Sequence, residues 1–243
     1  MILEVKDAIK KFGGILALNK MSISMDSAEI LGLVGPNGAG KTTLINCISG
    51  YYKLDSGVIR FMNRSITNLP AHVISRLGIA RTYQIPRPNP DITVLDNVMI
   101  GALFSQDQRN IRDAYVVAEG LVKLVGLSSK RESLAKNLTL VEKKFLDLAR
   151  ALSTNPKLLM IDELIAGLNP VEAEQAINLI KKIRYDYDLA IIFIEHVMSA
   201  VMRLSDRVIV MHEGKKIAEG APTDIIRDEK VVEVYLGRGY THA

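Results

Sequence analysis

The sequence predicts a mixed α/β fold, in which a β/α core carries an antiparallel β segment and is interrupted by a helical insertion. Three observations indicate this fold class. Short, wholly apolar segments at 30–34, 158–161 and 189–194 are typical of strands buried on both faces of a parallel sheet. The residues before this first apolar segment read as antiparallel strands joined by turns. Helical periodicity dominates from about residue 86 to about residue 153.

Turn and strand signals place the N-terminal elements. Gly13-Gly14 and Asp26-Ser27 mark turns, so we expect short antiparallel strands between them and before them. The apolar strand at 30–34 runs directly into a glycine-rich segment. Beyond that segment, the expected elements are a helix at 44–49, ended by Gly50, and a hairpin-like stretch at 57–62.

A proline-rich segment begins the insertion. The prolines between residues 85 and 90 exclude a continuous helix or a central strand, so we interpret this stretch as a hinge. Thr93 and Asp96 then form a capping-box pattern at the start of an apolar helix. We therefore predict a single domain with a helical subdomain at 86–153 and a core made of residues 1–85 and 154–243.

The C-terminal part alternates buried strands with helices. The strand at 158–161 ends in Asp162-Glu163, and Asn169 with Pro170 then begins a helix that reaches about residue 185. The remaining expected elements are a strand at 189–194 that ends in Glu195-His196, a hairpin with strands at 207–211 and 215–219, and a helical tail.

Composition excludes several classes of protein. With 243 residues, of which 48% are hydrophobic and 24% charged, the chain is neither disordered, nor collagen-like, nor a disulfide scaffold. The net charge of +4 comes from scattered basic pairs, so we expect no nucleic-acid partner. No apolar run reaches the ~18–20 residues that span a bilayer, and the N-terminus lacks the signal-peptide order. Together with the single cysteine, Cys47, these features indicate a cytoplasmic protein whose membrane role depends on a partner.

One motif carries a specific chemistry. Residues 35–42 match the pattern G-x-x-x-x-G-K-[ST] in full, and a strand precedes them while a helix follows. Backbone amides of such a loop surround phosphate groups, and the helix N-terminus adds a partial positive charge. Lys41 is expected to contact the β- and γ-phosphates, and the Thr42 hydroxyl a Mg²⁺ ion. The predicted nucleotide-binding residues of this loop are Gly35, Pro36, Asn37, Gly38, Ala39, Gly40, Lys41, Thr42 and Thr43.

The acidic pair Asp162-Glu163 indicates a functional site only in combination with that loop. Taken alone, two acids after a strand are most simply solvent-exposed residues that open a loop. With a phosphate loop upstream in the same kind of sheet, one carboxylate can hold Mg²⁺ through water and the other can orient an attacking water. Gln84 and His196 are individually weak signals, and their value lies in their order along the chain.

This ordered series resembles the ATP-binding-cassette (ABC) ATPases over essentially the whole chain. The resemblance identifies Phe12 with the aromatic residue that stacks on adenine, Gln84 with the glutamine loop and His196 with the switch histidine. It identifies Asp162 with the magnesium aspartate and Glu163 with the catalytic glutamate. Residues 138–142 stand where the family has its LSGGQ signature, and residues 166–169 stand at the dimer-contacting D-loop. Residues 81–84, 166–170, 195–198 and 233–237 are most similar to the ATPase subunits of branched-chain amino-acid importers.

The resemblance implies a P-loop NTPase (RecA-like) core and ATP hydrolysis by a head-to-tail dimer. Each ATP would lie between the phosphate loop of one subunit and the signature of the other, where Thr139 would contact it. Glu163 would polarise water, His196 would contact the γ-phosphate beside Lys41, and Gln84 would join the Mg²⁺ site. The helical insertion would dock transmembrane permeases, so the chain would lie at the cytoplasmic face of the cell membrane. Its dimer partner would be a second ABC ATPase subunit, either identical or different.

The chain departs from the family pattern at three places. Leu164 replaces a proline, Val197 replaces an aspartate, and the signature carries Leu140, Val141 and Glu142 in place of two glycines and a glutamine. Thr139 and Glu142 also fit a capping box, which would satisfy the helix-end amides that a phosphate needs. We therefore expect the phosphate-loop face of this chain to bind ATP well, and its signature face to contact the ATP of the other subunit poorly.

Two alternatives to an amino-acid importer stay open, and a third is disfavoured. The chain could be the ATPase of a lipid or lipopolysaccharide exporter, which differs in its permease rather than in these motifs. The altered signature keeps open a regulatory subunit that hydrolyses weakly. An ABC ATPase acting on DNA or ribosomes is disfavoured, because 243 residues leave no room for a second cassette or a long coiled coil. The transported substrate cannot be assigned from residues of this chain.

Overall fold

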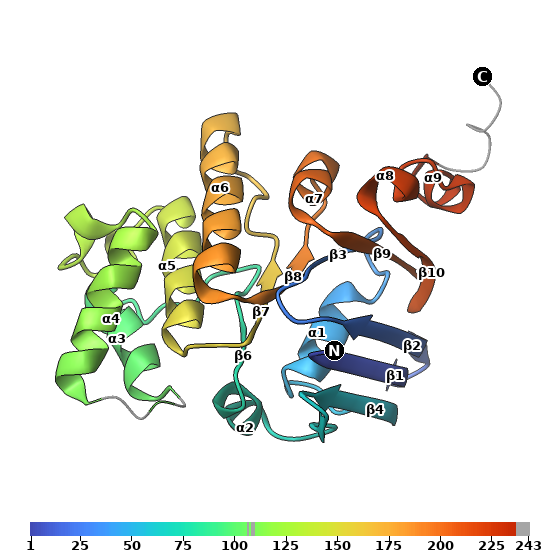
Figure 1. The fold of residues 1–243 in the computed structure, drawn as a ribbon, viewed down its shortest axis with the longest axis horizontal. Coiled ribbons are helices and arrows are strands. Elements are labelled where there is room, and N and C mark those ends of the chain that lie inside the picture. Colours follow the sequence, from blue (N-terminus) through green and yellow to red (C-terminus); the bar gives the residue numbers. More distant parts are fainter. Residues whose placement is uncertain (106, 108–109, 237–243) are drawn as a thin grey trace.

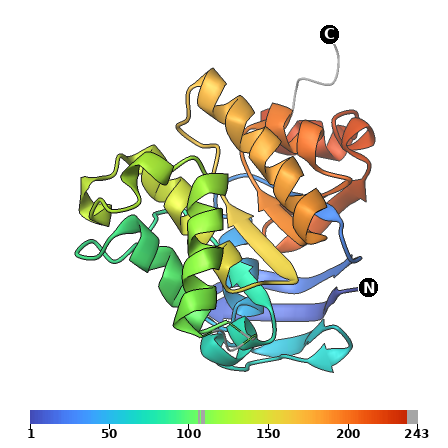
Figure 2. The same cartoon turned by 60° about the vertical axis from the view of Figure 1, so that its left-hand side comes forward.

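Two β-sheets and a lateral group of helices make up the computed structural model, which describes residues 1–105, 107 and 110–236. Figure 1 shows helices α3, α4 and α5 gathered at one side of the molecule and strands β1, β2 and β4 at the other. In the turned view of Figure 2, the green helices lie largely to the left and the blue strands extend to the right. Among the described residues, none of the helices is both long enough and apolar enough to cross a membrane.

The N-terminal sheet is antiparallel, as predicted. Its order is β2-β1-β4-β5, with β1 and β2 joined at Gly13-Gly14. These first two strands have ten and eleven residues and are longer than the short strands expected from the sequence. The bounds are Leu3–Phe12 for β1, Ile15–Met25 for β2, Ser56–Phe61 for β4 and Arg64–Ser65 for β5.

The second sheet has the order β10-β9-β3-β8-β7-β6 and is parallel except for β10. Its bounds are Ile30–Val34 for β3, Ile79–Arg81 for β6, Leu158–Asp162 for β7, Ala190–Ile194 for β8, Arg207–His212 for β9 and Lys215–Gly220 for β10. The three buried strands and the C-terminal hairpin predicted from the sequence are confirmed. Because the carboxyl ends of parallel strands meet at one edge, the segments after β3, β7 and β8 lie together.

Most helices also match expectation, with corrections at some ends. The bounds are Lys41–Ile48 for α1, Ala71–Arg76 for α2, Val94–Leu103 for α3, Ile111–Leu124 for α4, Leu140–Ser153 for α5, Pro170–Tyr187 for α6, Met198–Leu204 for α7, Pro222–Ile225 for α8 and Glu229–Leu236 for α9. Short 3₁₀ turns lie at Ser128–Lys130 and Ala135–Asn137. The sequence prediction missed α2, α7 and β6, and α1 begins three residues before the predicted 44, because Gly40 rather than an apolar residue starts it.

The capping predictions were partly right. Asn169 caps α6 through a complete capping box, with Pro170 in the first turn, as expected. Thr93 caps α3 by accepting the Asp96 N–H, but the Asp96 carboxylate accepts the Thr93 hydroxyl instead of its backbone N–H. The second half of the predicted box is therefore wrong, because the shorter aspartate bonds the nearer side chain. The subdomain boundaries at 86 and 153 stay a prediction.

The parallel sheet is buried on both faces. In β7, Leu159 and Ile161 join a cluster with residues of α3 to α7, whereas Leu158 and Met160 join a second cluster with α1 and the antiparallel sheet. The same alternation holds in β3 and β8 because successive side chains of a strand point to opposite faces. Packing on both faces fixes the carboxyl edge of the sheet as a rigid platform.

Candidate nucleotide-binding site

The loop between β3 and α1 has a backbone that only glycine permits. Gly35 and Gly40 have φ angles of +151° and +101°. A Cβ atom at Gly40 would lie 2.5 Å from the carbonyl oxygen of Ala17, and one at Gly35 would overlap the Met211 carbonyl. The sequence spacing therefore corresponds to a real constraint on the loop.

The N-terminus of α1 is open. Within the described ranges, no side chain caps it, and its first turn contains no acid. The N–H groups of this first turn consequently remain available to an anion. Lys41 is 6% exposed, and its ammonium donates to the Gly35 carbonyl over 2.5 Å and to the Pro36 carbonyl over 3.1 Å. Burial lowers the pKa of Lys41, although Glu163 and Asp162 oppose this shift.

One cavity unites the loop with side chains distant in sequence. It measures about 470 Å³ and lies between residues 37–43, residues 15–17 of β2, and the three side chains of Gln84, Glu163 and His196. The fold thus places most of the predicted phosphate loop and three predicted site residues around one space. Phe12 is not among the residues that line it in the described part of the chain.

Glu163 lies at the centre of a hydrogen-bonded group. Gln84 Nε2 donates to Glu163 Oε2 over 2.7 Å, and His196 Nε2 lies 2.7 Å from Glu163 Oε1. The backbone of Glu163 has φ +52°, and its N–H donates to the Ile194 carbonyl over 3.0 Å. This left-handed conformation turns the chain sharply after β7 and aims the carboxylate into the cavity.

The three predicted magnesium ligands are Thr42, Gln84 and Asp162. They line a common cavity of about 210 Å³. Asp162 is 3% exposed, and its Oδ2 atom has no hydrogen-bond partner among the residues described. The nearest cation is Arg81, whose Nη2 atom lies 3.7 Å from this oxygen. Burial raises the pKa of Asp162, and Arg81 opposes that shift. Since a buried, unbonded carboxylate oxygen beside a hydroxyl and an amide oxygen suits Mg²⁺, these residues fit the ion.

Phe12, the predicted adenine contact, is at the end of β1. Its ring packs edge-on against Tyr52 with centroids 5.0 Å apart, and the Lys10 ammonium lies 5.2 Å from its centroid. It is 40% exposed and pairs with Ile15, a residue that does line the larger cavity. Its role stays a prediction.

The signature segment closes its own helix end. Glu142 N–H donates to the Thr139 hydroxyl over 3.2 Å, and Thr139 N–H donates to the Glu142 carboxylate over 2.9 Å, which confirms the predicted capping box. Lys130 lies 2.6 Å from the same carboxylate. Burial opposes the ionisation of Glu142, but Lys130 and Thr139 outweigh it and lower its pKa. Leu140 is 63% exposed beside this cap.

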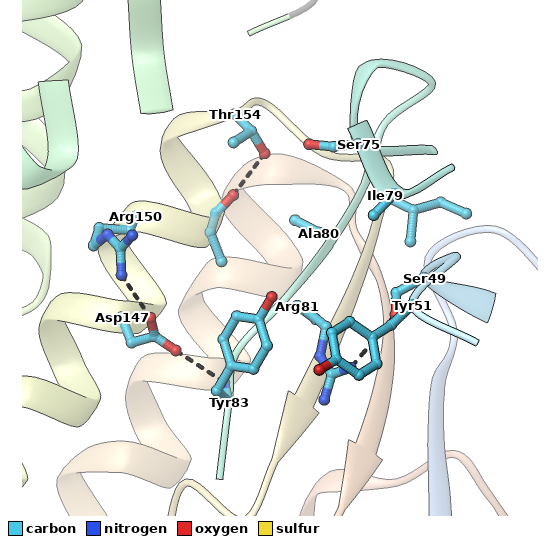
Figure 3. Close-up of a pocket in the computed structure, with 12 residues that line it drawn as sticks. Ser49, Tyr51, Ser75, Ile79, Ala80, Arg81, Tyr83, Asp147, Arg150 and Thr154 are labelled. Carbon is cyan, nitrogen blue, oxygen red and sulfur yellow. Dashed lines mark hydrogen bonds and ion pairs between the residues drawn. The ribbon is translucent and has the colours of Figure 1, made fainter. Parts of the chain in front are cut away.

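Sequence reasoning missed several buried charges around the site. Asp147 of α5 is 4% exposed and accepts the Tyr83 N–H over 2.9 Å, next to Gln84. It also pairs with Arg150, as Figure 3 shows. Lys144 and Glu195, which are 8% and 1% exposed, flank the turn that contains Glu163. The available signal was a charge among residues of the apolar helix face, as in Leu146-Asp147-Leu148.

Comparisons with known proteins agree with this geometry. Residues 18–166 match the ABC transporter family model, and residues 215–241 match the model described as "Branched-chain amino acid ATP-binding cassette transporter". The chain is 36% identical to the Salmonella typhimurium "High-affinity branched-chain amino acid transport ATP-binding protein LivG", over 97% of this chain and 98% of that protein. It is 38% identical to a "Probable branched-chain amino acid transport ATP-binding protein LivG" of Archaeoglobus fulgidus, over 97% and 95%.

Solved structures with the same fold include ATP-binding cassettes of ABC transporters. A nucleotide-free cassette superposes with a TM-score of 0.86 at 32% identity, covering 98% of this chain and 99% of that one. A cassette in its ADP conformation superposes with a TM-score of 0.84 at 33% identity, with the same coverage. The two sheets and the helical side of this chain are therefore those of such a cassette.

Proposed function

The chain belongs to the ATP-binding subunits of ABC transporters and is an ATPase, and from this premise we propose that it powers the import of branched-chain or other hydrophobic amino acids. The observation that carries the ATPase mechanism is the position of Glu163. Its carboxylate lies between Gln84 and His196 and borders the same cavity as the phosphate loop.

In this proposal the residues at the carboxyl edge of the parallel sheet have distinct roles. The amides of residues 35–43 and the Lys41 ammonium bind the β- and γ-phosphates, so Lys41 exchanges its bonds to loop carbonyls for bonds to phosphate. Thr42, Gln84 and Asp162 hold Mg²⁺, which neutralises charge on the phosphates when it is bound. Glu163 orients a water and accepts its proton as the water attacks the γ-phosphorus, while the bond from this phosphorus to the bridging oxygen breaks and ADP leaves. His196 holds the Glu163 carboxylate and contacts the γ-phosphate.

The substrate assignment rests on the relatives and on the C-terminal region. The relatives at 34–38% identity are named branched-chain amino acid transport ATP-binding proteins, and residues 215–241 match a model described for the same transporters. Because the cavity of this chain takes a nucleotide, we assign selection of the amino acid to permease partners. The chain would then work at the cytoplasmic face of the membrane, with those permeases and a second ABC ATPase subunit.

A subunit that hydrolyses weakly on its own is favoured by one observation. The capping box at Thr139 occupies the helix end that would contact the ATP of the partner. In this variant of the proposal, the chain contributes one productive ATP face and one degenerate signature face. A second cassette with an ordinary signature would then complete the productive site.

Replacing Glu163 by Gln tests the catalytic assignment. The amide preserves shape but cannot accept a proton, so we expect hydrolysis to fall roughly 10²–10⁴-fold while MgATP still binds. ATP-bound dimer should accumulate and be visible by size exclusion with and without Mg²⁺. Glu132→Gln, at an exposed glutamate in the helical region, is the matched control. Unchanged hydrolysis by Glu163→Gln would move the catalytic role to another residue.

Co-purification from native membranes tests the transport assignment. The chain is expected to bring down permeases and a second ATPase, and the reconstituted complex should hydrolyse ATP faster in the presence of leucine, isoleucine or valine. Stimulation by a lipid, with no response to these amino acids, would favour an exporter instead.

A further inference from the structure

The turn that carries Glu163 rests on a buried lysine of α5. The Lys144 ammonium donates to the carbonyls of Glu163, Leu164 and Ala166 over 2.9, 3.2 and 2.6 Å. A lysine has three donors, and here all three are directed at the backbone of one short turn. The side chain is 8% exposed, so water does not compete for these bonds. Lys144 therefore fixes the direction of three backbone carbonyls within the turn at 163–166.

A buried glutamate at the end of the neighbouring strand β8 holds the same turn. Glu195 is 1% exposed, follows β8 directly, and accepts the Ile165 N–H over 2.6 Å. Its other oxygen has no hydrogen-bond partner in the part of the chain that the structure describes. Burial raises the pKa of Glu195 and lowers that of Lys144, and each charge opposes the shift of the other. The turn at 163–166 thus lies between two opposite charges that have both left water.

Burial of this charge pair is costly, and well-packed apolar residues of similar volume often stabilise a protein as much or more. The contacts of the pair point to another role. The three hydrogen bonds that Lys144 donates and the one that Glu195 accepts from Ile165 all go to the backbone of residues 163–166. Because Glu163 has a left-handed backbone at φ +52°, the position of its carboxylate depends on how firmly that backbone is held.

We propose that Lys144 and Glu195 are positioning residues, which hold the backbone of Glu163 so that its carboxylate faces the γ-phosphate. Lys144 lies two residues after Glu142 on the same helix. Its hydrogen bonds therefore also connect the signature end of α5 to the turn that carries Glu163. Asp147, one turn further along α5, binds the Tyr83 N–H beside Gln84 (Figure 3). Both partners of the Gln84–Glu163 hydrogen bond are thereby attached to one helix.

This inference rests on the proposed role of Glu163, and Lys144→Met is its first test. Methionine fills a similar volume but donates no hydrogen bond. We expect kcat to fall about 10- to 100-fold, as misplaced catalytic groups generally cause. The Kd for MgATP should stay within about twofold, because the phosphate loop is untouched. Lys143→Met, at the neighbouring and more exposed lysine of α5, is the matched control and should leave both values unchanged.

A second variant separates positioning from stability. Lys144→Met leaves Glu195 buried without its counter-charge, so part of any loss could come from a weakened fold. Adding Glu195→Gln removes that charge, and the double variant should regain thermal stability without regaining kcat. The amide exchange of Ile165 should be faster in both variants than in the parent protein. Recovery of kcat together with stability would overturn the positioning role, as would an unchanged kcat in Lys144→Met.

Glu163→Gln in the same assay distinguishes the two possible failures. If Glu163→Gln is inactive while Lys144→Met keeps its full kcat, the positioning role is wrong and the proposed function stands. If Glu163→Gln hydrolyses ATP normally, the proposed catalytic role of Glu163 fails, and the positioning role fails with it.

Discussion

Two helix N-termini of this chain differ in a way that decides whether they can bind phosphate. The end of α1 begins at Gly40, has no side-chain cap in the described structure and no acid in its first turn. The end of α5 begins at Thr139, has a complete capping box, and contains Glu142 paired with Lys130. One end is open and positive, and the other is closed by its own side chains.

The difference shows that a helix N-terminus is an anion site only while its amides are free. Both helices carry the same backbone dipole, but at α5 the Thr139 hydroxyl already accepts the Glu142 N–H and the Glu142 carboxylate already accepts the Thr139 N–H. Leu140, at 63% exposure, adds bulk where a partner's phosphate would approach. The Lys130 ion pair reduces the repulsion that Glu142 would exert on a phosphate. We therefore expect side-chain bulk and the bonded N–H groups to hinder phosphate binding at α5 more than the charge does.

The largest effect is expected at the open end. Lys41→Ala removes the cation nearest the β- and γ-phosphates and forfeits charge-assisted hydrogen bonds of roughly 1.5–3 kcal/mol each. Loss of two such bonds corresponds to a decrease in MgATP affinity of about 100-fold or more. Calorimetry measures the affinity, and Lys6→Ala on the exposed face of β1 is the control. An affinity within about twofold of the parent would refute the assignment of the phosphate loop.

A smaller, opposite effect is expected from opening the closed end. Leu140→Gly, Val141→Gly and Glu142→Gln together remove the bulk beside the first amides of α5 and remove the acid. Repulsion of ~1–4 kcal/mol at 4 Å, reduced here by Lys130, corresponds to a gain of about tenfold in ATPase rate. The rate of the isolated protein is measured against protein concentration, with Glu119→Gln as a control for charge alone. If the dimer-dependent rate does not rise, the signature does not limit this subunit.

The smallest effect concerns stability rather than catalysis. Thr139→Ala removes the cap of α5 and should lower the free energy of unfolding by about 1 kcal/mol. Thr139→Ser keeps the hydroxyl and should restore most of this loss. Denaturant unfolding measures both variants at one pH. Equal stabilities for the alanine and serine variants would show that the closed end contributes nothing to the fold.

Much of the fold was predictable because its signals are local. Alternating apolar residues, the turn at Gly13-Gly14 and the cap at Asn169 each depend on a few neighbouring residues, and the structure agrees with all three. The elements that were missed, α2, α7 and β6, are six, seven and three residues long. Segments this short carry too few residues for a periodic pattern, and β6 is a strand only because it pairs with β7.

The sequence by itself determined the chemistry of the loop at 35–43, because glycines at fixed spacing before a lysine permit only a few backbone paths. It also determined the capping box at Thr139, which needs residues only three positions apart. Only the tertiary structure decided that Gln84, Glu163 and His196 meet, since the hydrogen bonds among them join residues 79 and 33 positions apart. Parallel strands packed on both faces bring their carboxyl ends to one edge, and no local pattern encodes which side chains face each other there. The same packing buries Lys144 and Glu195 against the turn that carries Glu163, contacts that the linear sequence does not reveal.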